Sequence, residues 1–118
     1  MANAVLFIGW GTPVPGRERQ ALRVFNDSLQ YYSRLQQEGQ IESFEPVLLE
    51  QHGNELGSFI LLRGDQEQLS RLRADTEFQH NTTRAGLVVE NLGVVSGFLG
   101  DNLNRIMGDY QTQIDELT

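Results

Sequence analysis

The sequence predicts a single α+β domain, and two observations support this prediction. The chain has 118 residues, the size of one domain, and its share of apolar residues is ordinary for a globular protein. Short apolar segments rich in β-branched and aromatic residues alternate with longer segments whose apolar residues recur every three or four positions. We therefore expect strands and helices to alternate within one unit that spans residues 1–118.

The first half of the chain is expected to form a strand, a helix and a second strand. Ala4–Trp10 is rich in Val, Phe and Ile and ends at a loop of prolines and glycines, which is typical of a strand. Arg17–Glu38 has apolar residues at helical spacing and stops at Gly39, which predicts a long amphipathic helix. Ile41–Gln51 predicts another strand, and Pro46 within it favours an edge position or a bulge.

A hairpin and a second helix are expected next. Ser58–Arg63 is a third apolar run, and the short connection before it makes it the antiparallel partner of the second strand. Asp65 and Gln68 stand in the positions of a capping box at the start of the second helix. We expect this helix to break near Asp75-Thr76, with Thr76 as the cap of the segment that follows.

The last third of the chain predicts a fourth strand and a C-terminal helix. The strand is Leu92–Leu99, and its glycines suggest a bulge or a close approach of the backbone. The helix is Asp101–Leu117, with Asp101 or Asn102 as its N-cap. Its apolar residues form one stripe. They are Leu103, Ile106, Met107, Tyr110, Ile114 and Leu117.

This order of elements is the βαββαβ pattern of ferredoxin-like domains, an antiparallel four-stranded sheet with helices on one face, here followed by a C-terminal helix. Both faces of the predicted sheet are apolar. In the first strand Val5 and Phe7 oppose Leu6 and Ile8, and the third and fourth strands repeat this pattern. An uncovered apolar face predicts a homodimer in which two sheets pack together. The alternative is a monomer whose C-terminal helix folds across the sheet.

The combination resembles the dimeric α+β barrel superfamily, which includes antibiotic-biosynthesis-type monooxygenases, EthD-like proteins and stress-responsive barrel proteins. The chain also resembles an uncharacterised group of bacterial proteins. That likeness rests on Ile8-Gly9-Trp10-Gly11 with Pro13-Val14-Pro15-Gly16-Arg17-Glu18, on 39–49 and on 72–79. The resemblance implies a shared dimeric fold. It implies no known activity and supplies no catalytic motif.

Composition excludes several classes of function. The net charge of −7 repels phosphate backbones and anionic membranes, so we expect neither nucleic acid nor membrane as a partner. All nine basic residues are Arg, which excludes a lysine Schiff base and a Walker phosphate loop on this chain. There is no Cys to serve as a nucleophile or thiolate ligand. We expect no cofactor, and a cytoplasmic location because the N-terminal apolar run is short and follows no basic residue.

Catalytic and metal-binding motifs are also missing. Gly9-Trp10-Gly11 lies at the end of the first predicted strand, but Val14 replaces the third glycine of a dinucleotide-binding loop. No Gly-x-Ser-x-Gly elbow is present, and His52 and His80 lack the spacing of a zinc-protease motif. We therefore expect no metal and assign no catalytic residue.

The sequence does offer a candidate ligand site. Ligand pockets combine aromatic walls with a few orienting polar groups, and a pocket between sheet and helices could be built from five residues. They are Trp10, Tyr32, Arg63, Phe78 and His52. Arg63 could hold a carboxylate or phenolate, or could pair with a surface acid. His52 could act as a base, or could be an exposed turn residue.

Two functions are compatible with these features. The first is binding of a small aromatic or carboxylate-bearing molecule between sheet and helices, with turnover left open. The alternative is a non-catalytic dimeric module, associated with stress or with protein interaction, whose core would contain no ligand-sized cavity.

Overall fold

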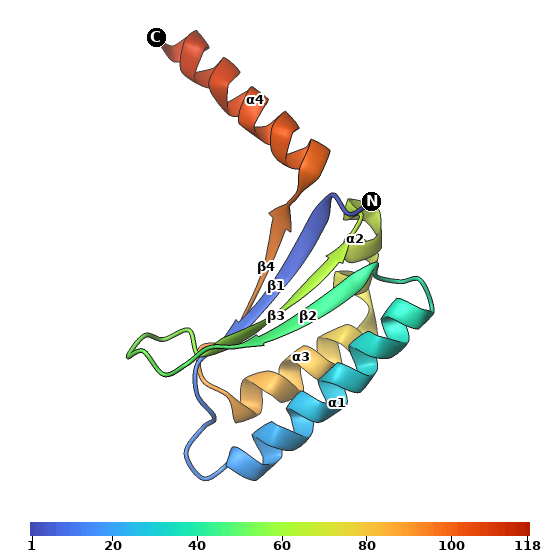
Figure 1. Ribbon diagram of the computed structural model, residues 1–118, viewed down its shortest axis with the longest axis vertical. Coiled ribbons are helices and arrows are strands. Elements are labelled where there is room, and N and C mark those ends of the chain that lie inside the picture. Colours follow the sequence, from blue (N-terminus) through green and yellow to red (C-terminus); the bar gives the residue numbers. More distant parts are fainter.

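The chain folds into one antiparallel sheet with helices on one face, as the sequence predicts (Figure 1). The computed structural model describes residues 1–118. The strands lie in the order β2-β3-β1-β4, and all neighbours are antiparallel. The elements are β1 (Ala4–Trp10), α1 (Glu18–Gln37), β2 (Ser43–Leu48), β3 (Ser58–Gly64), α2 (Gln66–Ala74), α3 (Thr76–Val88), β4 (Gly93–Phe98) and α4 (Gly100–Leu117).

The core lies between the sheet and helices α1, α2 and α3. Alternate residues of β1 face these helices, so Leu6 and Ile8 are buried and pair across the sheet with Leu62 and Ile60 of β3. Helix α1 contributes a buried stripe from the same side, as its helical spacing predicts. Leu22 is an exception among the apolar residues of α1, because its side chain is 61% exposed. The main core cluster is Ala4, Leu6, Ile8, Tyr31, Tyr32, Leu35, Ile41, Ile60, Leu62, Leu69, Leu72 and Phe78.

Local signals set most helix ends. Gly39 adopts a φ of +74° just after α1, a conformation that favours glycine. Asp65 and Gln68 form the expected capping box of α2. The predicted break near Asp75-Thr76 is confirmed, but the cap is Asp75 and not Thr76. The Phe78 amide donates to the Asp75 carboxylate at 3.4 Å, because Asp75 is the residue that retains an extended backbone.

The strands are shorter than predicted at both edges of the sheet. β2 is an edge strand, as Pro46 predicts, but it ends at Leu48. β4 pairs with β1 without interruption, so its glycines create no bulge. One glycine does allow a close approach. A Cβ added to Gly97 would lie 2.8 Å from a methyl group of Val5 on β1.

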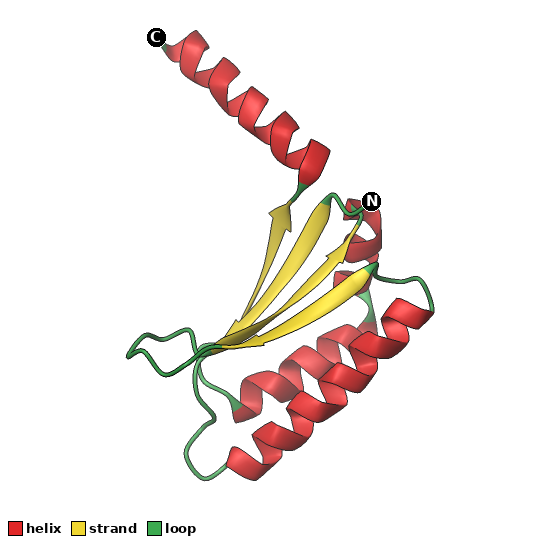
Figure 2. Ribbon diagram, viewed as in Figure 1, coloured by secondary structure: helices red, strands yellow, loops and turns green.

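Helix α4 projects away from the rest of the domain (Figures 1 and 2). Leu99 occupies its N-cap position without a side-chain hydrogen bond, so the predicted caps Asp101 and Asn102 are wrong. The Asn102 side chain instead donates to the Asn3 carbonyl at 3.1 Å. The radius of gyration is 16.4 Å, whereas a compact domain of this length has about 13.5 Å. The alternative in which α4 folds across its own sheet is therefore not the arrangement observed.

The sheet face opposite the helices stays uncovered. We call it the open face and define it by Val5, Phe7, Phe59, Leu61 and Val95. The rings of Phe7 and Phe59 stack at 5.0 Å between centroids on this face, and Val95 is 57% exposed. Both faces of the sheet are therefore apolar, as the alternation predicts. No helix of the chain has the length and apolar character needed to cross a membrane.

Candidate functional site

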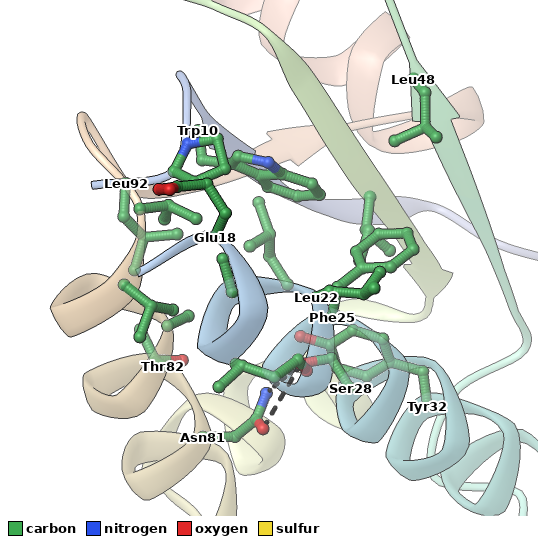
Figure 3. A pocket seen from close by; sticks show the side chains of 18 residues that line it. Trp10, Glu18, Leu22, Phe25, Ser28, Tyr32, Leu48, Asn81, Thr82 and Leu92 are labelled. Atoms are coloured by element: carbon green, nitrogen blue, oxygen red, sulfur yellow. Dashed lines mark hydrogen bonds between the residues drawn. The ribbon is translucent and has the colours of Figure 1, made fainter. Parts of the chain in front are cut away.

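A mostly apolar pocket lies between the helix-facing side of the sheet and helices α1 and α3 (Figure 3). We call it the sheet–helix pocket. Its volume is about 270 Å³, and 13 of its 18 lining residues are hydrophobic. The sheet supplies one wall through β1, β2 and β3, while α1 and α3 supply the opposite wall. Central lining residues are Ile8, Trp10, Phe25, Tyr32, Ile60 and Leu92.

Aromatic side chains form one part of the wall. Trp10 is the last residue of β1 and Phe25 lies on α1, and their rings meet edge to face at 5.9 Å between centroids. Edge-to-face pairs keep a defined geometry while leaving ring surface available to another aromatic group. Leu22 and Leu48 also line the pocket, although they are 61% and 69% exposed. These two leucines therefore mark the side on which the pocket meets solvent.

Polar groups gather where α1 and α3 meet. The Ser28 hydroxyl donates to the Val24 carbonyl at 2.7 Å and accepts from the Asn81 amide at 3.1 Å. The Thr82 hydroxyl donates to the Phe78 carbonyl at 2.9 Å. Ser28 is buried and Asn81 half-buried, so this cluster presents polar atoms to an otherwise apolar space. It can hydrogen-bond one polar group of a bound molecule.

Tyr32 lines the same pocket and remains a neutral phenol. It is 2% exposed. Burial raises the pKa of Tyr32 to about 12, and the Asn81 side chain partly offsets this effect by hydrogen bonding. At neutral pH the hydroxyl is therefore protonated and can both donate and accept a hydrogen bond.

The pocket contains no positive charge. Glu18 is its only ionised lining residue, and the Gly16 amide donates to the Glu18 carboxylate at 2.7 Å. No group of three His, Cys, Asp or Glu side chains is arranged to hold a metal ion. The lining therefore favours a neutral molecule over an anion.

Of the five predicted site residues, the structure brings only Trp10 and Tyr32 together in the pocket. Arg63 lies on the opposite side of the sheet, because it follows Leu62 by one residue and successive strand residues face opposite ways. Its guanidinium contacts the Glu45 carboxylate of β2 at 3.1 Å. Arg63 thus forms the surface ion pair that was the alternative interpretation.

The other two predicted residues also lie outside the pocket. Phe78 is 3% exposed and belongs to the main core cluster between the sheet and the helices. His52 lies in the exposed loop between β2 and β3 and contacts no lining residue through a hydrogen bond or ion pair. The turn interpretation of His52 therefore agrees with its position.

Sequence analysis missed the polar residues of α3. The polar segment around His80 predicts a surface position, and His80 is indeed exposed. A usable signal was nevertheless present in the spacing of 78, 81, 82, 85 and 88, which is helical and places these positions on one face. Asn81 and Thr82 on that face reach the pocket together with Ala85 and Val88.

Tyr31 neighbours Tyr32 in the sequence but not in the pocket. Its hydroxyl is buried without a hydrogen-bond partner. Burial, with the nearby carboxylates of Asp75 and Glu77, raises the pKa of Tyr31 above its usual value. On the outer side its ring packs under the Arg34 guanidinium, 5.3 Å from the ring centre.

Comparison with known proteins yields structural relatives only. No family model matches the chain, and no curated protein matches it. A dimeric ferredoxin-like protein of unknown function from Bacteroides fragilis is 12% identical, with a TM-score of 0.62, over 81% of this chain and 95% of that chain. A dimeric ferredoxin-like protein of unknown function from Jannaschia is 12% identical, with a TM-score of 0.61, over 82% and 97% of the two chains.

A third similar structure is SnoaB from Streptomyces nogalater, described as a cofactor-independent oxygenase. It is 17% identical, with a TM-score of 0.50, over 84% of this chain and 93% of that chain. Identities this low establish the architecture and leave the activity open. The chain therefore has the ferredoxin-like α+β fold shared by these proteins, as its order of strands and helices predicts.

Proposed function

We propose that the protein binds a small uncharged aromatic molecule in the sheet–helix pocket. The observation that carries this proposal is the division of the pocket into an aromatic wall and a polar cluster. Trp10 and Phe25 supply the wall, while Ser28, Asn81 and Tyr32 supply hydrogen-bonding groups. This combination is typical of sites that bind and orient small molecules.

The size of the pocket narrows the class of ligand. Its volume of about 270 Å³ lies just below the range of roughly 300–1,000 Å³ for typical ligand pockets. A molecule with one or two aromatic rings fits this space better than a larger polycyclic compound. A single hydroxyl or keto oxygen on the ring would match the polar cluster.

Charge narrows the class further. The sequence allowed a carboxylate-bearing ligand held by Arg63, but that guanidinium lies across the sheet and pairs with Glu45. A carboxylate in the pocket would be desolvated without a cation and would share the space with Glu18. We therefore favour phenols and aromatic ketones. SnoaB supports the idea that this fold can serve small-molecule chemistry, but our proposal covers binding and no reaction.

Binding can be measured with 2-naphthol, which has two rings and one neutral hydroxyl. We expect 2-naphthol to raise the melting temperature, because a ligand at tenfold excess over its Kd adds about 1.4 kcal/mol to the free energy of unfolding. This corresponds to a rise of a few degrees for a chain of this size. 2-Naphthoate should have little effect. Equal stabilisation by both compounds would contradict the chemistry proposed for the pocket.

A pair of variants locates the binding site. Ala85 lines the pocket and Ala74 is exposed at the end of α2. Ala85→Phe should fill the pocket and abolish the response to 2-naphthol, whereas Ala74→Phe should keep it. If Ala85→Phe still folds and binds as wild type does, the ligand lies elsewhere. Circular dichroism of both variants separates loss of binding from loss of fold.

We also propose that the protein is a homodimer whose open faces pack together. The support is the apolar open face, which carries Phe7, Phe59 and Leu61 without cover from α4, and a contiguous patch of this kind is rare on monomers. The two unknown-function relatives are dimeric ferredoxin-like proteins. A second copy of the same sheet matches the open face in size and symmetry.

The alternative function is a dimeric interaction module that needs no ligand. The exposed apolar stripe of α4 is the observation that favours it, because this stripe lies outside both the pocket and the sheet. A broad panel of small aromatic compounds that all fail to stabilise the protein would favour this alternative. The cytoplasmic location stays a prediction, which fractionation of cells that make the protein can check.

A further inference from the structure

The exposed stripe of α4 has the spacing of a coiled-coil seam. α4 is an 18-residue helix, and beyond its first turn it extends away from its own domain (Figure 1). Exposed apolar residues on it follow one another at intervals of four, three, four and three. They are Leu103, Met107, Tyr110, Ile114 and Leu117. This alternation keeps the side chains on one narrow line, which fits the surface of one neighbouring helix.

Helix α4 needs such a neighbour to be stable. Its N-cap residue, Leu99, supplies no side-chain hydrogen bond, and none of its residues is buried. Gly108 in its middle lowers the intrinsic helix propensity. Helices of this length are marginal in water when they pack against nothing, since most helical stability in proteins comes from an apolar face that is covered. A surface outside this subunit must therefore cover the stripe.

The charge pattern indicates that the covering surface is a second α4. When Met107 and Ile114 occupy a positions of a heptad, the flanking e and g positions hold no charged residue. Those flanks are Asn104, Ile106, Gln111, Gln113 and Thr118. The acidic residues of α4, such as Asp109 and Asp115, occupy b and c positions away from the seam. Two copies can therefore approach without repulsion between acids, and their amides can hydrogen-bond across the seam.

We propose that α4 pairs with α4 of a second copy through this seam. The pairing goes beyond the proposed ligand binding and uses a surface separate from the open face. The dimeric relatives match almost their whole length, yet leave unmatched a part of this chain about as long as α4. The seam would give this chain a second self-associating surface.

Cysteine cross-linking of the full chain tests the pairing, because the chain has no native Cys. Tyr110 lies at the centre of the stripe, so it meets its own copy in either a parallel or an antiparallel pair. We expect Tyr110→Cys to form a covalent dimer under mild oxidation, since paired cysteines need Cα atoms within about 7 Å. Thr112→Cys, on the outer face, should stay monomeric on a denaturing gel. Absence of cross-linking at position 110, or equal cross-linking at 112, would overturn the proposal.

A second variant tests whether cross-linking through α4 depends on the open face. Val95→Glu places a charge on the open face, at a position in β4 that is not part of the seam. Cross-linking should persist when Val95→Glu is combined with Tyr110→Cys, since the seam does not depend on the sheet. Its loss there would overturn the claim of a separate surface, whereas cross-linking that persists after the sheet-to-sheet dimer has been weakened would support it.

Hydrogen exchange gives a second readout that needs no cysteine. In the native chain the amides of 104–117 should be protected by pairing. Met107→Glu should accelerate their exchange roughly tenfold or more, because an unpaired α4 frays. Arg105→Glu adds a similar acidic group at an outer f position, and although it removes the exposed ion pair of Arg105 with Asp109 it should accelerate exchange far less than Met107→Glu does. Fast exchange of 104–117 already in the wild-type protein would overturn the proposal.

Discussion

Tyr32 belongs to both the core and the candidate site. Its ring packs in the main core cluster and near Phe44 of β2, at 6.1 Å between ring centres. Its hydroxyl end lines the sheet–helix pocket beside Asn81. A residue in this position links the stability of the fold to the chemistry of the pocket, so changes at Tyr32 should be visible in both.

The raised pKa of Tyr32 predicts a loss of stability at high pH. An unfolded tyrosine ionises near pH 10.0, whereas burial holds the pKa of Tyr32 at about 12. The stability that its neutral form contributes is therefore fully present below pH 10 and is lost as the pH rises towards 12. Two pH units correspond to about 2–3 kcal/mol in the free energy of unfolding. Urea unfolding between pH 8 and 11 measures the slope.

Tyrosine variants identify the source of that slope. Tyr32→Phe should make the pH dependence shallower, because it removes this buried phenol and leaves Tyr31 as the other buried tyrosine. Tyr32→Phe should also weaken binding of 2-naphthol by roughly fivefold, in line with a lost hydrogen bond of about 1 kcal/mol. An unchanged slope in Tyr32→Phe would assign the alkaline loss to Tyr31 or to another group.

Sequence reasoning found part of the site because aromatic residues stand out while small polar ones do not. Trp10 and Tyr32 are predicted ligand-binding residues, and both line the pocket. Ser28 and Asn81 gave no signal by residue type, because buried serines and asparagines look like surface residues unless the helical face is known. Arg63 forms the surface ion pair, the second of the two roles that the sequence left open, since two apolar faces leave the direction of a strand-end residue undetermined.

At the scale of elements, side-chain caps decide where helices begin. Asp65 accepts from the Gln68 amide at 2.8 Å, and the Gln68 side chain contacts the Asp65 amide in return. Asp75 starts α3 in a related way, through the Phe78 amide. The start of α4 lacks any such contact. Capping boxes are local patterns, so the sequence predicted the first, whereas Asp101 matched the pattern by composition alone.

Because α2 has a side-chain cap and α4 has none, similar substitutions at their starts should reduce the free energy of unfolding by different amounts. Asp65→Ala should reduce the free energy of unfolding by about 1–2 kcal/mol, because it removes the cap of α2. Asp101→Ala should change it by less than about 0.5 kcal/mol, since Asp101 is exposed and caps nothing. Urea midpoints of the two variants measure the difference. Equal costs would mean that Asp101 has a partner outside this subunit.

At the scale of the whole molecule, both faces of the sheet are apolar and only one of them is covered by helices. The alternation of Val5 and Phe7 with Leu6 and Ile8 predicted both faces correctly, because the period of a strand is fixed. The direction taken by α4 could not be predicted, since an amphipathic stripe shows that a helix is covered but not by which surface. The sequence therefore predicts the two faces of the sheet, but it does not predict where α4 lies relative to them.

The proposed sheet-to-sheet dimer predicts a clear effect of one charge. Val95 and Leu87 are 57% and 59% exposed, but only Val95 lies on the open face. Val95→Glu should raise the dissociation constant of the proposed face-to-face dimer at least tenfold, because a carboxylate would be buried against apolar side chains. Leu87→Glu should not. Sedimentation of the two variants over a range of concentrations measures the shift, and equal behaviour of both would contradict the dimer.

The two edges of the sheet differ, and the difference limits uncontrolled assembly. Pro46 stands on edge strand β2 and lacks an amide hydrogen, so a foreign strand cannot form a regular ladder there. β4, at the other edge, has no proline and keeps its donors. Strand addition between copies could join β4 to β4 and would then stop, because each outer edge would present Pro46. Pairing through the sheet edges alone can thus join two copies and no more.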